Sequence, residues 1–191
     1  MRVITGSAKG HRLRAPSDLG TRPMLDRVKE SLFSVLEGYD AIRGRVLDLY
    51  AGSGAIGIEC LSRGAAWADF VEQRAHVCQI IADNLAHTRL TERARVIRSP
   101  VERFLATHRP QHSYDILMMD PPYADPQIPA TIATIARSDL LDADGVLIVG
   151  HSPRVTLEDG YGRLRRIKLR RLGDSCFSIY RIGTATDADG E

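Results

Sequence analysis

The chain has 191 residues, of which 43% are hydrophobic, and a formal net charge of +2. This length and composition are typical of one globular domain that buries about 70% of its unfolded surface. No apolar run approaches the ~20 residues that span a bilayer, and no signal-peptide core follows Met1, so the sequence predicts a cytoplasmic protein without a membrane segment. The three cysteines are widely spaced and the six histidines are scattered, which favours neither a disulfide framework nor a metal site.

The charge is unevenly distributed along the chain. Residues 1–45 carry +4, residues 46–150 carry −4, residues 151–183 carry +5 and the last eight residues carry −3. A solvated surface can hold such charges without any partner. Basic ends around an acidic centre nevertheless favour a nucleic-acid partner that is bound through its phosphates.

Residues 1–20 contain several cations and glycines but few apolar residues. This pattern predicts a basic N-terminal arm or hairpin with little core of its own, ahead of a single domain over residues 21–183. We expect a flexible arm of this kind to be the main contact to nucleic acid, through Arg2, Lys9, Arg12 and Arg14. A helix over residues 25–37 follows, because its apolar residues recur on one face.

A glycine-rich loop joins a predicted strand at 46–50 to a predicted helix at 55–63. Gly52 and Gly54 allow a ligand to approach the backbone closely, and with Gly57 they match the dinucleotide fingerprint G-x-G-x-x-G. Asp48 argues against a dinucleotide, because a carboxylate would repel a pyrophosphate but accept from an ammonium group. The predicted cofactor contacts here are Asp48, Tyr50, Ala51, Gly52, Ser53 and Gly54.

Glu72 ends a second predicted strand, at 67–71, and lies 18 positions after Gly54. A carboxylate at this place can accept hydrogen bonds from both hydroxyls of a ribose. Together with Asp48 and the glycines, Glu72 and the adjacent Gln73 describe a pocket for an amino acid joined to a nucleoside. S-adenosylmethionine is such a molecule.

Asp120-Pro121-Pro122-Tyr123 follows a predicted buried strand at 114–119. Consecutive prolines fix φ and donate no hydrogen bonds, so Asp120 and the nearby carbonyls form a rigid set of acceptors. The ring of Tyr123 offers a surface on which a base can stack. Acceptors beside a stacking surface describe a pocket for the exocyclic amine of a nucleobase, with Asp120, Pro121 and Tyr123 as its catalytic residues and Asp120 also near the cofactor.

The other predicted elements alternate between strands and helices. Such alternation predicts an α/β fold with a mostly parallel sheet covered on both faces, closed by a C-terminal antiparallel hairpin. That gives seven strands in all. The acidic tail at 184–191 is predicted to be disordered. The remaining elements are helices at 74–87, 101–107 and 127–137, strands at 94–98 and 145–150, and hairpin strands at 164–172 and 176–182.

Taken together, the glycine loop, the strand-end acid and Asp120-Pro121-Pro122-Tyr123 resemble the class I S-adenosylmethionine-dependent methyltransferases. The segments Arg22–Phe33, Leu47–Glu59 and Leu61–Ala65 are more narrowly similar to the RsmD family, and the resemblance covers residues 3–182. The family's enzymes methylate the N2 amine of one guanine in 16S ribosomal RNA within the small subunit.

The resemblance implies a Rossmann-like fold, S-adenosylmethionine as cofactor, and small-subunit ribosomal RNA, presented as an RNA-protein assembly, as partner. We expect a monomer. It adds Arg22 and Arg27 to the expected RNA contacts. It also places the adenine near Ser99, Pro100 and Val101. The family usually has Asn or Asp here, so in this chain backbone groups or Ser99 would recognise the adenine amine.

Three other functions remain open at this point. A DNA adenine-N6 or cytosine-N4 methyltransferase uses a similar Asp/Asn-Pro-Pro-aromatic turn, although the chain leaves little room for a target-recognition domain. A dinucleotide-dependent oxidoreductase would explain the glycine loop but not residues 120–123. A non-catalytic RNA chaperone would explain the basic ends but not the cofactor signature.

Overall fold

The computed structural model describes residues 1–16, 26–38, 42, 44–109, 111–122 and 125–183. The side chains of Asp26 and Arg27 lie outside this description. The helices are α1 (Asp26–Glu37), α2 (Ala55–Ser62), α3 (Ala75–His87), α4 (Val101–Thr107) and α5 (Ile128–Ala136), with a short 3-10 helix η2 (Thr91–Arg93). The strands are β1 (Arg45–Leu49), β2 (Trp67–Glu72), β3 (Ala94–Arg98), β4 (Tyr114–Met119), β5 (Leu141–His151), β6 (Gly160–Tyr161), β7 (Leu164–Leu172) and β8 (Ser175–Ile182).

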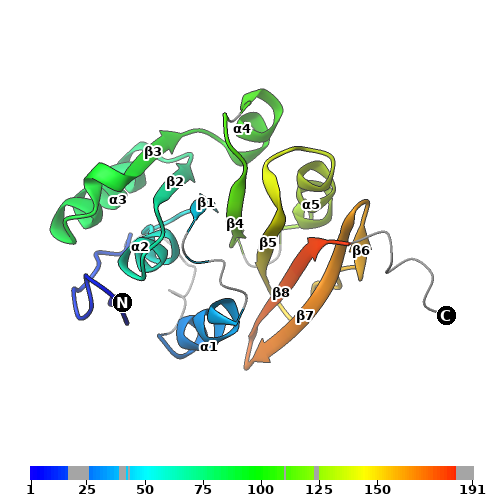
Figure 1. Ribbon diagram of the computed structural model, residues 1–191, viewed down its shortest axis with the longest axis horizontal. Helices are drawn as coiled ribbons and strands as arrows, with labels where there is room; N and C mark the ends of the chain where they lie inside the picture. The colour runs from blue at the N-terminus through cyan, green and yellow to red at the C-terminus, as the bar shows by residue number, and fades with distance from the viewer. Residues whose placement is uncertain (17–25, 39–41, 43, 110, 123–124, 184–191) are drawn as a thin grey trace.

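The strands form one sheet in the order β3-β2-β1-β4-β5-β8-β7-β6 (Figure 1). The five strands from β3 to β5 run parallel, while β8, β7 and β6 pair antiparallel. The predicted α/β class and the C-terminal hairpin are therefore confirmed. The order of strands reverses between β1 and β4, which is where open α/β sheets bind their ligands.

The sheet has eight strands where the sequence predicts seven. The additional strand is β6, whose two residues pair with Leu164 and Arg165 of β7. A two-residue strand has too few positions to show an alternating pattern, so periodicity cannot reveal it. β5 also begins at Leu141, four residues before the predicted start, and bulges where it pairs with Tyr114.

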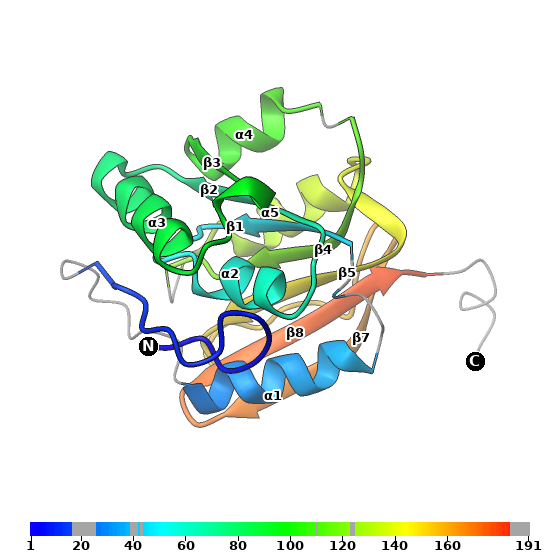
Figure 2. The same ribbon diagram turned by 60° about the vertical axis from the view of Figure 1, so that its left-hand side comes forward.

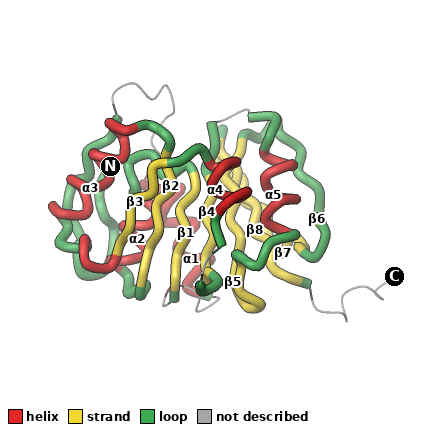
Figure 3. The backbone as a smooth tube through the Cα atoms, turned by 90° about the horizontal axis from the view of Figure 1, so that it is seen from above, coloured by secondary structure: helices red, strands yellow, loops and turns green. Residues whose placement is uncertain are grey.

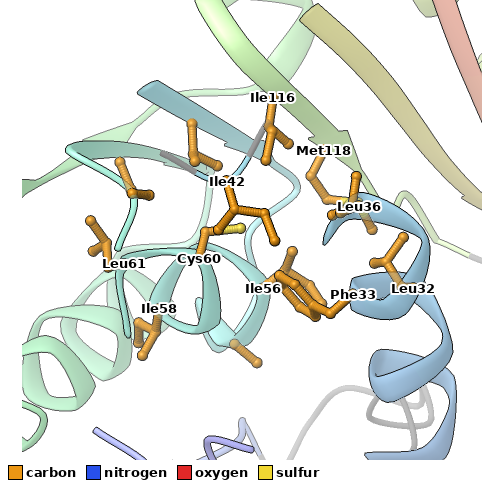
Figure 4. Close-up of a cluster of buried hydrophobic side chains, with 14 of the residues drawn as sticks. Leu32, Phe33, Leu36, Ile42, Ile56, Ile58, Cys60, Leu61, Ile116 and Met118 are labelled. Atoms are coloured by element: carbon orange, nitrogen blue, oxygen red, sulfur yellow. The ribbon is translucent and has the colours of Figure 1, made fainter. Parts of the chain in front are cut away.

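Helices cover both faces of the sheet, as Figures 2 and 3 show. On one face, α1, α2 and α3 bury their apolar side chains against the strands. On the other face, α4 and α5 pack against the alternate residues of the same strands. Figure 4 shows part of the first cluster, where Phe33 and Leu36 of α1 approach Ile56 of α2 and Met118 of β4.

The N-terminal segment is a hairpin that is docked on α2 and not a free arm. Arg2 and Arg12 form an antiparallel bridge, as the hairpin prediction requires. Val3, Ala8 and Leu13 are buried in the same cluster as α1 and α2. As expected, the hairpin has no separate core, but these three side chains are part of the main core. The expectation of flexibility is wrong for residues 1–16, because a packed segment cannot move freely.

Hydrogen bonds fix this hairpin to α2. The backbone N–H groups of Ile4 and Thr5 donate to the Glu59 carboxylate at 2.8 and 3.0 Å. Further along, the N–H of Ala8 donates to the Ser62 hydroxyl at 2.9 Å. Few apolar residues are needed for docking when the backbone itself is held in this way.

None of the helices in the described ranges combines the length and the apolar character that a bilayer crossing requires. Within the same ranges, no three His, Cys, Asp or Glu side chains are grouped so as to hold a metal ion.

Candidate active site

A cavity of about 390 Å³ opens at the carboxyl ends of β1, β2 and β4. Three acidic side chains, Asp48, Glu72 and Asp120, reach it from these three strands. The remaining lining residues are Met1, Ala15, Pro16, Val28, Tyr50, Ala51, Gly52, Ser53, Ala55, Ile56, Val71, Gln73, Arg74, Ser99, Val101, Glu102, Pro121, Pro122, Asp125 and Ser175.

The loop between β1 and α2 forms one wall of this cavity. Gly52 and Gly54 have φ of 54° and 74°, and Tyr50 has φ of 57°, so the chain passes through left-handed conformations immediately after β1. These angles favour glycine and are uncommon for tyrosine. The N–H of Ala51 donates to the Val71 carbonyl at 3.0 Å, which ties the loop to the end of β2. The loop is therefore held as a fixed backbone surface.

Asp48 lies beneath this loop and is 3% exposed. One of its oxygens, Oδ2, accepts a 3.0 Å hydrogen bond from the N–H of Gly57 in α2. Burial raises the pKa of Asp48 to about 8; the Gly57 N–H opposes this shift, and the nearby Asp120 and Glu72 carboxylates add to it. A cation in the cavity would favour the ionised form of Asp48.

Gly57 allows α2 to lie close enough for that hydrogen bond. A Cβ at Gly57 would lie 2.3 Å from the Phe70 ring of β2 and 3.2 Å from Asp48 Oδ2. The third glycine of the G-x-G-x-x-G pattern thus serves helix-strand packing, as it does in dinucleotide-binding folds.

Glu72 is held rigidly at the end of β2. Its Oε1 accepts from the backbone N–H of Arg74 at 2.9 Å and from the Arg74 guanidinium at 3.1 Å, while its Oε2 faces the Gly52 N–H at 3.3 Å. Carboxylate oxygens have further lone pairs, so Glu72 can still accept from a ligand. The N–H of Ser99 donates to the Glu72 carbonyl at 3.1 Å, which brings the end of β3 beside the same edge.

Asp120 follows β4 directly and reaches solvent through the cavity. Desolvation by the surrounding protein raises its pKa to about 6. Its carboxylate occupies space that a side chain on β5 would fill, because a Cβ at Gly150 would lie 2.3 Å from Asp120 Oδ1. The pairing of Met119 with Val149 explains this contact, since Asp120 and Gly150 are the next residues on adjacent strands.

The structure brings most of the predicted cofactor contacts together. Gly54 does not line the cavity and instead caps α2 with its left-handed backbone. Pro100 lines a neighbouring shallow depression with Arg98 and Arg103. Tyr123 lies outside the described residues. The predicted catalytic residues Asp120 and Pro121 line the cavity, and so do the predicted cofactor contacts Asp48, Tyr50, Ala51, Gly52, Ser53, Glu72, Gln73, Ser99 and Val101.

Sequence reasoning missed the N-terminal hairpin as part of the cavity wall. Met1, Ala15 and Pro16 line it, and the hydroxyl of Ser53 lies 3.7 Å from the sulfur of Met1. Neither a motif nor a chemical function marks these residues in the sequence. Val28 of α1 and Ser175 at the start of β8 were missed for the same reason.

The basic residues predicted to contact RNA are only partly described. Lys9 and Arg12 are exposed, and Arg14 is exposed but forms a 2.9 Å ion pair with Asp83 of α3. Arg2 lies in the hairpin bridge. Arg22 and the side chain of Arg27 lie outside the described residues. Their contact with RNA stays a prediction.

Comparisons with known proteins agree with this arrangement. The sequence model of a family described as "Conserved hypothetical protein 95" matches residues 1–181. The chain is 37% identical over 183 residues to the "Putative rRNA methyltransferase YlbH" of Bacillus subtilis, a match covering 95% of this chain and 98% of that protein. It is 38% identical over 148 residues to the "Ribosomal RNA small subunit methyltransferase D" of Escherichia coli K12, covering 78% and 72% of the two chains. Among solved structures, a hypothetical protein of Thermus thermophilus has a TM-score of 0.82 at 30% identity, covering 95% of this chain and 99% of that chain.

Proposed function

The chain belongs to the RsmD family, described as conserved hypothetical protein 95, and from that membership we propose that it methylates the N2 amine of a guanine in 16S ribosomal RNA. S-adenosylmethionine is the proposed methyl donor. The proposed substrate is RNA of the small ribosomal subunit, presented as an RNA-protein assembly. The observation that carries the proposal is the cavity in which Asp120 and the proline turn meet Asp48 and Glu72.

The residues of the cavity fit this cofactor. Asp48 suits the ammonium group, Glu72 suits the ribose hydroxyls, and Ser99 and Val101 lie at the end where the adenine would bind. When bound, the cofactor supplies a methyl group on a positively charged sulfur. Five carboxylates line the cavity, and two of them, Asp48 and Asp120, have a raised pKa; together they favour such a cation.

The target amine would be bound by acceptors at the end of β4. The amine of guanine is a weak nucleophile, because its lone pair is delocalised into the ring. We infer that the Asp120 carboxylate and the Pro121 carbonyl accept its two N–H bonds, which favours a pyramidal nitrogen with a directed lone pair. With a pKa of about 6, Asp120 is largely ionised at neutral pH and can also take up the proton that the methylated amine releases.

Alignment supplies most of the rate in this scheme. Proline has no backbone N–H, so Pro121 places no competing donor beside the acceptors. A paired base cannot reach the cavity and must be unpaired or flipped. Stacking of that base on Tyr123 stays a prediction from the sequence.

Methyl transfer to small-subunit particles from a strain lacking the enzyme tests the proposal. Labelled S-adenosylmethionine is the donor, and digestion to nucleosides identifies the product. We expect N2-methylguanosine in 16S RNA. Duplex DNA is tested as the acceptor in parallel, and label in its adenine or cytosine, with none in RNA, would instead support a DNA methyltransferase.

The variant Asp120→Asn tests the role of the Asp120 carboxylate. It retains the size of the side chain but exchanges one acceptor for a donor, so transfer should fall about 10²–10³-fold, the cost of losing one preorganised polar group. Cofactor affinity measured by calorimetry should stay within a few fold. A parallel loss of cofactor affinity would show that Asp120 serves the cofactor and not the base.

A further inference from the structure

The cavity has two distinct sides, set by the order of the strands. Glu72 ends β2, Gln73 follows it and Ser99 follows β3, all on one side of β1. Ser175 begins β8, on the other side of β4 and β5. If the nucleoside part of the cofactor lies with Glu72, then the RNA must approach from the side of Asp120 and Ser175.

The strand beside Ser175 is strongly basic. Five of the nine residues of β7 are Lys or Arg, and none is acidic. Two of these cations are engaged within the protein: Arg166 pairs with Asp159, and Arg165 donates to the carbonyls of Gly162 and Leu164. The other three, Lys168, Arg170 and Arg171, form no ion pair with any residue that the structure describes, and both arginines are exposed.

Two of these three cations, Arg170 and Arg171, lie next to the turn that reaches the cavity. Arg170 and Arg171 pair with Phe177 and Cys176 of β8, directly beside the turn that leads to Ser175. From Ile167 onward β7 is an open edge of the sheet, because β6 pairs with Leu164 and Arg165 and the N–H of Arg166 donates to the Asp159 carbonyl at 2.7 Å. The basic edge therefore runs up to the side of the cavity that the cofactor leaves for the target.

The cations project from both faces of this edge. Arg170 shares a face with Phe177, which packs in the α1 cluster, whereas Arg171 shares the opposite face. Ile167 and Leu169 lie between the cations and are 41% and 51% exposed, the two large hydrophobic side chains exposed to this degree in the described ranges. Cations interleaved with apolar side chains suit a polymer with both phosphates and sugar-base surfaces.

We propose that Lys168–Arg171 of β7 forms an RNA backbone track that leads the target nucleotide to Asp120. The proposal rests on the proposed function and assigns the phosphate contacts to β7 instead of the N-terminal hairpin. That hairpin is docked on α2, and its Arg14 is paired with Asp83 of α3. The hairpin's other exposed cations are Lys9, Arg12 and Arg2, the bridge partner of Arg12. The competing explanation for β7 is that its charges only protect an open sheet edge from aggregation.

Two charge-matched variants separate these explanations. Arg170→Gln/Arg171→Gln removes two cations from the track, and Arg98→Gln/Arg103→Gln removes two exposed cations beside the opposite edge strand, β3. The binding of 16S RNA is measured across a salt series. The track variant should flatten the slope of log affinity against log salt by about 0.7–0.9 for each phosphate that it no longer binds.

The track variant should also differ from the wild-type protein in its steady-state kinetics. At saturating RNA the track variant should retain kcat within about two-fold while KM for RNA rises at least ten-fold, and its affinity for S-adenosylmethionine should be unchanged. An equal or larger effect in the β3 variant would move the RNA interface to that edge. Unchanged RNA binding by the track variant, with more aggregation, would support edge protection and overturn the proposal.

The same experiment separates this inference from the proposed function. If the wild-type protein methylates small-subunit RNA, and the track variant has the same RNA affinity and the same KM for RNA, only the track is rejected. If the wild-type protein transfers no methyl group to RNA, the proposed function is rejected, and the salt series still decides whether β7 binds an RNA backbone.

Discussion

The pKa of Asp48 makes cofactor affinity depend on pH. In the unliganded protein this pKa is about 8, so Asp48 is mostly protonated at pH 6 to 7. A cationic ligand favours the ionised carboxylate, so binding in this range must release a proton. We expect the affinity for S-adenosylmethionine to rise from pH 6 to 8, by at most ten-fold per pH unit, and to level off above pH 8.

Calorimetry in buffers of different ionisation enthalpy measures that proton directly. Near pH 6.5 the wild-type protein should release close to one proton on binding. Asp48→Asn cannot release it, so this variant should bind more weakly and show little change of affinity with pH. The same pH dependence in Asp48→Asn would assign the proton to another group.

Gly150 should act as a positioning residue for Asp120. A methyl group at Gly150 would lie 2.3 Å from Asp120 Oδ1, so Gly150→Ala must displace the carboxylate. Because a shift of about 1 Å can cost 10²-fold in rate, kcat should fall by about that factor. Cofactor affinity should stay within a few fold, and this also shows that the variant is folded.

Gly160→Ala provides the control for Gly150→Ala. The nearest atom to its new methyl group is the terminal nitrogen of Arg165 at 3.1 Å, at the flexible end of a side chain. This variant should methylate RNA at nearly the wild-type rate. Gly150→Ala with wild-type kcat would show that the position of Asp120 is not critical.

The N-terminal hairpin depends on a buried ion pair. Lys29 Nζ lies 3.1 Å from Glu59 Oε2, with both side chains 0% exposed, and Arg63 donates to the other Glu59 oxygen at 2.9 Å. Lys29 also donates to the Arg2 carbonyl at 2.5 Å. The pair thus links α1, α2 and the hairpin, and through the hairpin it supports Met1 and the cavity wall.

Breaking this pair from one side should be costly. Glu59→Gln leaves the Lys29 charge buried without its partner, so the free energy of unfolding should fall by about 3–5 kcal/mol. Lys29→Met/Glu59→Gln removes both charges and should recover part of that loss. Urea unfolding measures the free energy of unfolding of the wild-type protein, Glu59→Gln and the double variant.

The exposed pair of Arg14 and Asp83 is the control for this cycle. Its side chains are 73% and 38% exposed, so Asp83→Asn should change the free energy of unfolding by no more than about 1 kcal/mol. Equal effects of Asp83→Asn and Glu59→Gln would show that the buried pair has no special role in stability.

At the scale of elements, the sequence predicted the parts with strong local patterns. The bounds of β3, β4 and α4 agree with their predicted ranges, and β4 is marked most clearly, by an apolar run that ends at two prolines. The docking of the hairpin could not be predicted, since it rests on backbone hydrogen bonds to Glu59 and on three separate apolar residues. The burial of Lys29 could not be predicted either, because lysine is rarely buried unless it is paired, and its partner Glu59 is 30 positions away.

The same limit applies to the candidate site. Asp48, Glu72 and Asp120 were predicted because each is an acid at the carboxyl end of a strand. Gly150 and Ser175 have no chemical signature, and they join the site only through the pairing of β5 with β4 and β8. Contacts made by tertiary pairing leave no local pattern in a single sequence.

At the scale of the whole molecule, the cavity connects distant parts of the chain. Its lining runs from Met1 to Ser175 and includes the hairpin, α1 and the ends of several strands. A ligand that binds only the folded state should raise the free energy of unfolding by about 2.7 kcal/mol at a concentration of 100 Kd.

Hydrogen exchange tests how far this stabilisation extends. With S-adenosylmethionine bound, the amides of Val3 and Leu13 in the hairpin should exchange more slowly, together with those of the loop after β1. Slower exchange in the loop alone would show that the hairpin lines the cavity without contributing to ligand binding. The exchange rates of the protein without S-adenosylmethionine provide the reference.

The position of β8 has a consequence for how the chain folds during synthesis. β8 is the final strand of the described sequence, yet it lies between β5 and β7 and pairs with both. Until residues 175–182 have been made, the nascent chain exposes Val146–His151 of β5 as an unpaired, strongly apolar edge. Such edges recruit other strands, so ribosome-bound or prematurely terminated chains that stop before Ser175 should aggregate, even though they already contain every acidic residue that lines the cavity.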